Sequence, residues 1–143
     1  MSGRPILLVH HDHQSVERTR RALVAHDILN PVVHVRDGSE ALDRVFGVGP
    51  RAVGDTLLLP ALIILDAAPP AIDALAVLRA LRGDERTRDL QVVVVTSADD
   101  QQLLLGSYDL GATTVLRRGT DPGQLSRVIE RLDLIPKPGR DPG

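Results

Sequence analysis

The chain has 143 residues, of which 43% are apolar and 1% aromatic, with one Phe, one Tyr and no Trp. This length suits a single domain with an aliphatic core, and so few rings argue against ligands that bind by stacking, such as bases or flavins. The absence of Cys excludes disulfides and thiolate chemistry, and a formal net charge of −2 argues against nucleic-acid and membrane-surface partners. We therefore expect a cytoplasmic protein.

Five short apolar runs, rich in β-branched residues, predict β-strands. In chain order they are Ile6–Val9, Val32–Val35, Leu62–Leu65, Val92–Val95 and Thr114–Leu116. The third and fourth runs are apolar at every position, which is typical of strands covered on both faces in a parallel sheet.

The stretches between these runs have the periodicity of amphipathic helices. The predicted helices are Gln14–His26, Ser39–Phe46, Ile72–Arg82, Asp99–Leu110 and one that begins after Asp121. Asp37, with Glu40 three residues later, resembles a capping box, and Asp121 followed by Pro122 resembles an N-cap with Pro at the first helical position.

A strand followed by a helix, five times over, predicts an α/β fold. We expect a three-layer (βα)5 doubly wound parallel sheet with the flavodoxin-like strand order 2-1-3-4-5. Residues 1–135 should form this domain, and residues 136–143, which contain three Pro and two Gly, should form an exposed C-terminal tail. Gly47–Leu59 is predicted to be a long surface loop.

Polar side chains follow the predicted strands at their carboxyl ends, where open α/β sheets bind ligands. Asp12 follows the first strand, Asp66 the third, Thr96 the fourth and Arg118 the fifth. Neighbouring carboxylates repel one another unless a cation lies between them, and Mg²⁺ accepts both carboxylate and phosphate oxygens. A hydroxyl and a guanidinium could hold a phosphoryl group that Asp66 accepts as the nucleophile.

Four motifs along residues 5 to about 135 together resemble a known family. They are ILLVHHD at 6–12, LIILD at 62–66 with Pro70 four residues on, VVVTS at 93–97 and GATTVLRR at 111–118. Their combination is similar to the receiver domain of two-component response regulators. Residues 30–46 and the long loop before the third strand resemble single-domain receivers associated with phytochrome kinases.

The resemblance implies a stand-alone receiver that accepts a phosphoryl group from a histidine kinase and signals by protein–protein contact. It implies Asp66, Thr96 and Arg118 as the residues of phosphoryl chemistry, with the Ala67 amide as a further phosphoryl contact. Mg²⁺ would be held by Asp12, Asp66 and the Ala68 carbonyl, with His11 as a marginal ligand. Chemistry would be limited to self-phosphorylation and autodephosphorylation of the aspartate, without turnover of a separate substrate.

Several positions depart from the family pattern. His11 is assigned to the first position of the acidic pair, Arg118 replaces the invariant Lys, Gly119 a cis-Pro, Val115 the switch aromatic and Ala74 a Gly. Imidazole suits Zn²⁺ or another transition metal better than Mg²⁺, so Mg²⁺ binding should be weakened. Arg118 keeps the positive charge, but a planar guanidinium does not replace a compact ammonium.

These departures leave an alternative from a different class open. The chain would then be a phosphorylation-independent pseudo-receiver, a protein-binding module regulated by a metal at His11, Asp12 and Asp66. A homodimer through an apolar surface that includes Leu134 and Ile135 is also left open. Among the other histidines, His10 is expected to pack or form a hydrogen bond near the strand end, and the others to be exposed: His13, His26 and His34.

Overall fold

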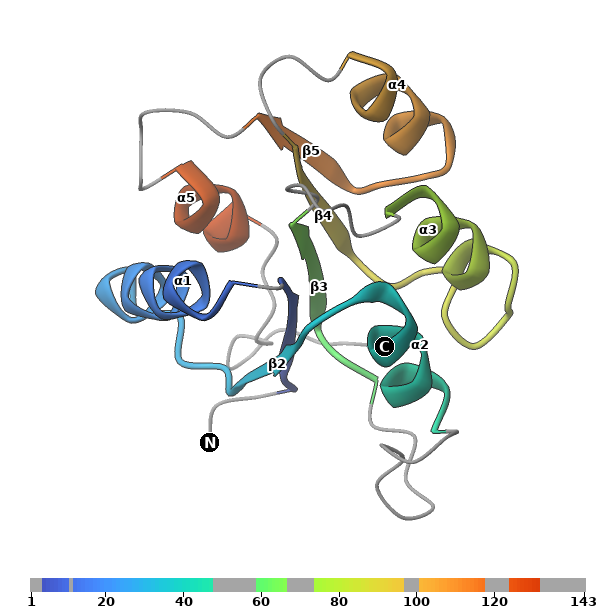
Figure 1. Ribbon diagram of the computed structural model, residues 1–143. Helices are drawn as coiled ribbons and strands as arrows, with labels where there is room; N and C mark the ends of the chain where they lie inside the picture. The colour runs from blue at the N-terminus through green and yellow to red at the C-terminus, as the bar shows by residue number, and fades with distance from the viewer. Residues whose placement is uncertain are drawn as a thin grey trace, which may run out of the picture.

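The computed structural model describes residues 4–10, 12–47, 59–66, 74–96, 101–117 and 124–131, in which five strands and five helices alternate (Figure 1). The strands are β1 (Ile6–Val9), β2 (Val32–Val35), β3 (Leu62–Asp66), β4 (Val92–Thr96) and β5 (Thr114–Arg117). The helices are α1 (His13–Ala25), α2 (Gly38–Phe46), α3 (Ala74–Arg82), α4 (Gln101–Asp109) and α5 (Gln124–Arg131). All neighbouring strands are parallel, in the order β2-β1-β3-β4-β5, which confirms the predicted fold.

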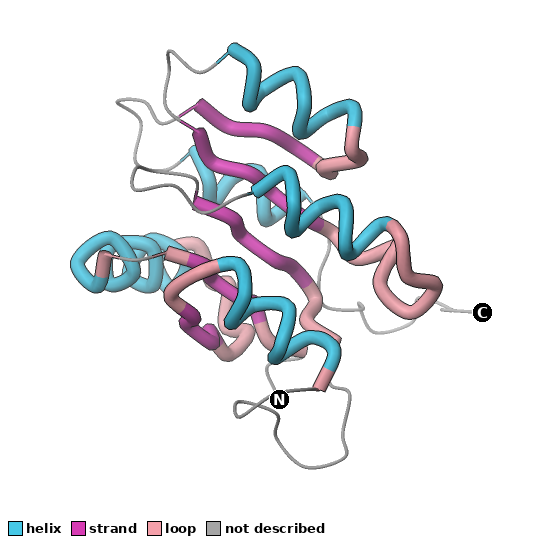
Figure 2. The backbone as a smooth tube through the Cα atoms, turned by 45° about the vertical axis from the view of Figure 1, so that its right-hand side comes forward, coloured by secondary structure: helices cyan, strands magenta, loops and turns pink. Residues whose placement is uncertain are grey.

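The helices form two layers on opposite faces of the sheet, with α1 and α5 on one face and α2, α3 and α4 on the other (Figures 1 and 2). Side chains alternate between these faces along each strand. In β1, Ile6 and Leu8 pack in the cluster that contains residues of α1 and α5, whereas Leu7 and Val9 pack with residues of α2 and α3. All four side chains are buried, which explains why the strands are apolar at every position.

The register of the sheet brings the polar residues that end the strands to one edge. Val9 pairs with Leu65, so the next residues, His10 and Asp66, lie side by side. Asp66 in turn pairs with Val95 of β4, and Thr96 is the following residue of that strand. The carboxyl edge of the sheet therefore brings His10, Asp66 and Thr96 together.

The observed elements differ from the predicted ones mainly at their ends. The strands β3, β4 and β5 each extend one residue further than predicted, to Asp66, Thr96 and Arg117. Helix α1 begins and ends one residue earlier than predicted. The amide of Glu40 donates to the side chain of Asp37 at 2.8 Å, which confirms the predicted N-cap of α2.

Some predictions fall on residues that the structure does not describe. They are the start of the last helix at Asp121 and Pro122, most of the long loop, the apolar pair Leu134 and Ile135, and the C-terminal tail at 136–143. Among the described helices, none is long and apolar enough to cross a membrane.

Candidate functional site

Asp66 ends the central strand β3, and its carboxylate contacts the imidazole of His10. The Nε2 atom of His10 lies 3.0 Å from Oδ2 of Asp66, with 5% of the His10 side chain and 15% of the Asp66 side chain exposed. A hydrogen bond this well shielded from water is stronger than one on the surface. The candidate nucleophile is therefore held by a direct side-chain contact from the neighbouring strand end.

Three further hydrogen bonds fix His10 in this position. Its main-chain N–H donates to the Val35 carbonyl at 3.0 Å, and its carbonyl accepts from Nε2 of His34 at 2.7 Å. Its Nδ1 accepts from the main-chain N–H of Asp12 at 2.7 Å. A ring nitrogen that accepts carries no proton, so the proton of the neutral ring is on Nε2 and is donated to Asp66.

The prediction that His10 forms a hydrogen bond near the strand end is thus confirmed. His13 is exposed, as predicted, but the same prediction is wrong for His34 and His26, which are half-buried. His34 contacts the carbonyl of His10, and Nδ1 of His26 lies 2.6 Å from Oε1 of Glu130 in α5. Both imidazole rings have polar partners on neighbouring elements, and the sequence around each histidine does not encode these long-range contacts.

Asp12 is the N-cap of α1. Its Oδ1 accepts from the main-chain N–H of Gln14 at 3.1 Å, and its Oδ2 accepts from the hydroxyl of Ser15 at 3.0 Å. The Ser15 hydroxyl, followed by the Gln14 amide, lowers the pKa of the Asp12 carboxyl. The structure gives this carboxylate a capping role, and the metal-binding role of Asp12 stays a prediction.

Substitutions at Asp12 should separate capping from charge. Asp12→Ala is expected to lower the free energy of unfolding and the urea midpoint, because α1 loses its N-cap. Asp12→Asn should recover most but not all of this loss, because its one carbonyl oxygen can still accept from the Gln14 amide but the second acceptor, for the Ser15 hydroxyl, is gone. Urea unfolding followed by circular dichroism measures both variants, and an equal loss for Asn and Ala would contradict the capping role.

Thr96 ends β4, and the residue is 1% exposed. Its Oγ1 has no hydrogen-bond partner among the described residues. A buried hydroxyl without a partner is unfavourable, by about 1 to 3 kcal/mol, unless a ligand or water satisfies it. Thr96 therefore presents an unused donor next to the strand that carries Asp66.

Of the predicted site residues, the structure describes Asp12, Asp66 and Thr96. The others lie outside the described residues, and their roles stay predictions: His11, Ala67, Ala68 and Arg118. Arg117, the last residue of β5, is exposed and donates to Oε1 of Gln101 in α4 at 3.2 Å. His10 joins the site although the sequence pattern does not assign it there; the signal for it is its place directly after the first strand.

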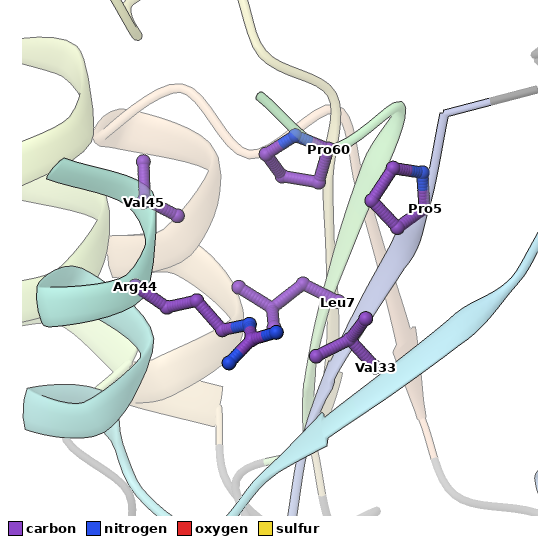
Figure 3. A pocket seen from close by; sticks show the side chains of 6 residues that line it. All are labelled: Pro5, Leu7, Val33, Arg44, Val45 and Pro60. Atoms are coloured by element: carbon purple, nitrogen blue, oxygen red, sulfur yellow. The ribbon is translucent and has the colours of Figure 1, made fainter. Parts of the chain in front are cut away.

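A pocket lies at the opposite, amino edge of the sheet, where β1 and β3 begin. Its lining comes from β1, β2, α2 and the residues before β1 and β3: Pro5, Leu7, Val33, Arg44, Val45 and Pro60 (Figure 3). The lining is apolar except for Arg44, so this pocket lacks the converging polar groups of a catalytic site. The carboxyl edge remains the candidate functional site.

No protein-family model matches the chain. The chain is 37% identical over 69 residues to the response regulator PleD of Caulobacter vibrioides, which covers 48% of the chain and 15% of PleD. It is 34% identical over 104 residues to the DNA-binding dual master transcriptional regulator RpaA of Synechocystis, which covers 70% of the chain and 43% of RpaA. The chain thus spans less than half the length of either relative.

Solved structures are similar over nearly the whole chain. The bacteriophytochrome response regulator RtBRR has a TM-score of 0.80 at 30% identity and covers 99% of this chain and 84% of its own. The bacteriophytochrome response regulator AtBRR has a TM-score of 0.74 at 33% identity and covers 96% of this chain and 97% of its own. The chain therefore belongs to the receiver-domain family of two-component response regulators. Within that family it is similar to the regulators associated with bacteriophytochromes.

Receiver domains generally bind Mg²⁺, but the described residues of this chain do not fit that ion. They contain no group of three or more His, Cys, Asp or Glu side chains that could hold a metal. Oδ2 of Asp66 accepts a hydrogen bond from Nε2 of His10, and both carboxylate oxygens of Asp12 accept hydrogen bonds at the start of α1. A hard cation needs such oxygens as ligands. The weakening of Mg²⁺ binding by His11, and Zn²⁺ or transition-metal binding, stay predictions.

Proposed function

We propose that this receiver accepts a phosphoryl group on Asp66 from the phosphohistidine of a histidine kinase and signals by contact with another protein. The observation that carries the proposal is the buried hydroxyl of Thr96, which has no partner among the described residues and ends the strand next to Asp66. A phosphoryl oxygen bound to Asp66 would give this hydroxyl an acceptor. The proposed phosphoacceptor domain is residues 1–135, acting in the cytoplasm.

In the proposed reaction, a carboxylate oxygen of Asp66 forms a bond to phosphorus as the phosphorus–nitrogen bond of the donor breaks. The bonding electrons leave with the donor imidazole, and Asp66 becomes an acyl phosphate. Positioning and neutralisation of the phosphoryl charge provide the catalysis. Thr96 would donate to one phosphoryl oxygen, and Arg118 and the Ala67 amide are the further contacts proposed from the family pattern.

A solved relative supports the phosphorylation. The phosphorylated cyanobacterial phytochrome response regulator RcpA is 26% identical to this chain, with a TM-score of 0.74, and covers 92% of this chain and 91% of its own. That protein carries its phosphoryl group on the same fold. The likeness to a phosphorylated regulator, together with Asp66 and Thr96 at the carboxyl edge of the sheet, supports the proposal.

A second candidate function is favoured by the contact between His10 and Asp66. The imidazole contacts one oxygen of the carboxylate in a buried setting, and in this second function the carboxylate holds the strand ends together. The chain would then be a pseudo-receiver that binds its partner without phosphorylation.

Treatment with a small phosphodonor distinguishes the two functions. The protein is incubated with acetyl phosphate, or with beryllium fluoride, with and without Mg²⁺, and examined by intact-mass spectrometry and amide NMR. With acetyl phosphate we expect the mass of one phosphoryl group to be added, and with either reagent we expect shifts of the Asp66 and Thr96 amides. Absence of both the adduct and the shifts would reject phosphoryl acceptance and leave the pseudo-receiver.

A further inference from the structure

The Oδ2 atom of Asp66, on the side of β1, already accepts a hydrogen bond from a protein N–H group. His10 approaches Oδ2 at 3.0 Å, and its ring must present an N–H there because Nδ1 accepts the Asp12 amide. An N–H donor and a metal ion compete for the same lone pairs of a carboxylate. A protonated ring nitrogen is also unable to act as a metal ligand itself.

Displacing the imidazole would break several contacts at once. The ring is held at both nitrogens, and the His10 main chain is held by β2 through Val35 and His34. The residue is 4% exposed. If the ring were displaced from Asp66, its N–H would lose its acceptor inside the protein, which is unfavourable unless the ring reaches solvent or another acceptor. A strongly hydrated cation such as Mg²⁺, which dehydrates reluctantly, is a poor competitor for this position.

We propose that His10 takes the place of a divalent cation on Asp66, so that this receiver neither binds a divalent cation at Asp66 nor needs one to accept a phosphoryl group. The second part rests on the proposed function. The hydrogen bond from His10 is compatible with the reaction. When Oδ1 forms the bond to phosphorus and the donor leaves with its bonding electrons, Oδ2 becomes a carbonyl oxygen that still accepts a hydrogen bond from Nε2–H of His10.

A titration with Mn²⁺ alone tests cation exclusion directly. Mn²⁺ broadens the NMR signals of nearby amides, so a bound ion would selectively weaken the signals of Leu65, Asp66 and Val9. We expect no saturable broadening of these signals in the native protein. Saturable broadening there would overturn the proposal, and this result needs no variant to fold.

The variant His10→Asp should bind Mn²⁺ at Asp66, unlike the native chain. It replaces the N–H donor by carboxylate oxygens next to Asp66, so we expect saturable Mn²⁺ broadening around Asp66. The double variant with Asp66→Asn should lose it again. His13→Asp is the matched control, because His13 is exposed on α1 and the change adds the same charge nearby without touching Asp66. Equal gains in His10→Asp and His13→Asp would contradict a specific role of His10.

The phosphodonor experiment separates this inference from the proposed function. A phosphoryl adduct that forms equally with EDTA and with Mg²⁺ supports both. An adduct that requires Mg²⁺ would overturn the inference and leave the proposed function standing. If no adduct forms under either condition while His10→Asp gains Mn²⁺ binding, the proposed function fails and cation exclusion stands.

Discussion

The variant Asp66→Asn is expected to show no mass increase after treatment with a phosphodonor under which the native chain gains one phosphoryl group. An amide is not nucleophilic and cannot form an acyl phosphate, so the loss should be complete rather than partial. The substitution keeps the shape of the side chain, and its carbonyl oxygen can still accept from Nε2 of His10. The fold should therefore survive, and the effect should be confined to the chemistry.

A matched control uses another carboxylate of the chain. Asp109, at the end of α4, is exposed, so Asp109→Asn should be phosphorylated to the same extent as the native protein. Peptide mapping of the adduct gives an independent assignment. An adduct that persists in Asp66→Asn would show that a different side chain accepts the phosphoryl group, and an equal loss in both variants would point to a general effect of charge.

A clear loss of stability is expected when Arg82 is replaced. Its guanidinium joins three segments through four hydrogen bonds: Nε and Nη2 donate to the Gly111 carbonyl at 3.0 and 2.7 Å, and Nη1 donates to the carbonyls of Arg88 and Leu90 at 3.0 and 2.8 Å. Burial lowers the pKa of this group, as expected for a charge withdrawn from water. The side chain ties the end of α3 to the segment before β4 and to the turn before β5.

The variant Arg82→Met should lower the free energy of unfolding by about 1 to 2 kcal/mol, because the carbonyls lose a charged donor and water replaces it only in part. Arg82→Lys should recover only part of this loss, since an ammonium cannot reproduce the fork of the guanidinium. Arg79→Met is the control, because Arg79 is exposed on the same helix and surface changes cost little. Urea midpoints at constant slope measure the differences, and a similar loss in both Met variants would refute the role of Arg82.

Gly111, in the turn before β5, accepts two of the hydrogen bonds of Arg82. Its φ of 89° lies in the left-handed region, and a Cβ at this position would lie 3.1 Å from Nε of Arg82. The turn before β5 therefore needs glycine both for its backbone conformation and for the close approach of the guanidinium. This pairing places Arg82 and the turn in one structural unit, within which effects of substitutions should not be additive.

The proposed exclusion of a cation changes how the carboxyl edge of this receiver would stabilise a phosphoryl group. Charge on a phosphoryl group would be balanced by hydrogen-bond donors of the protein, such as Thr96, instead of by a metal. The switch would also lack an aromatic ring on β5, because the buried Val115 stands at that position. The hydroxyl of Tyr108 in α4 instead accepts from the Val115 amide at 3.4 Å.

The fold could be predicted because its signals are local. Runs such as Leu62–Leu65 are apolar at every position, which indicates burial on both faces, and the pattern of Asp37 and Glu40 marks a helix start within a few residues. The strand ends at Asp66 and Thr96 were placed within one residue. In a parallel sheet, polar residues at the carboxyl ends of strands meet at one edge, so two of the site residues followed from the fold.

By itself, the sequence determined the (βα)5 fold and the polar edge with Asp66 and Thr96, because apolar periodicity and helix caps are encoded in neighbouring residues. Only the tertiary structure decided which of the consecutive residues after β1 faces Asp66. His10 takes that place because the register of β1 against β3 sets it beside Asp66, while the Asp12 carboxylate turns back to cap α1. The direction of a side chain past a strand end depends on the neighbouring strand and on the next helix, and neither is encoded locally.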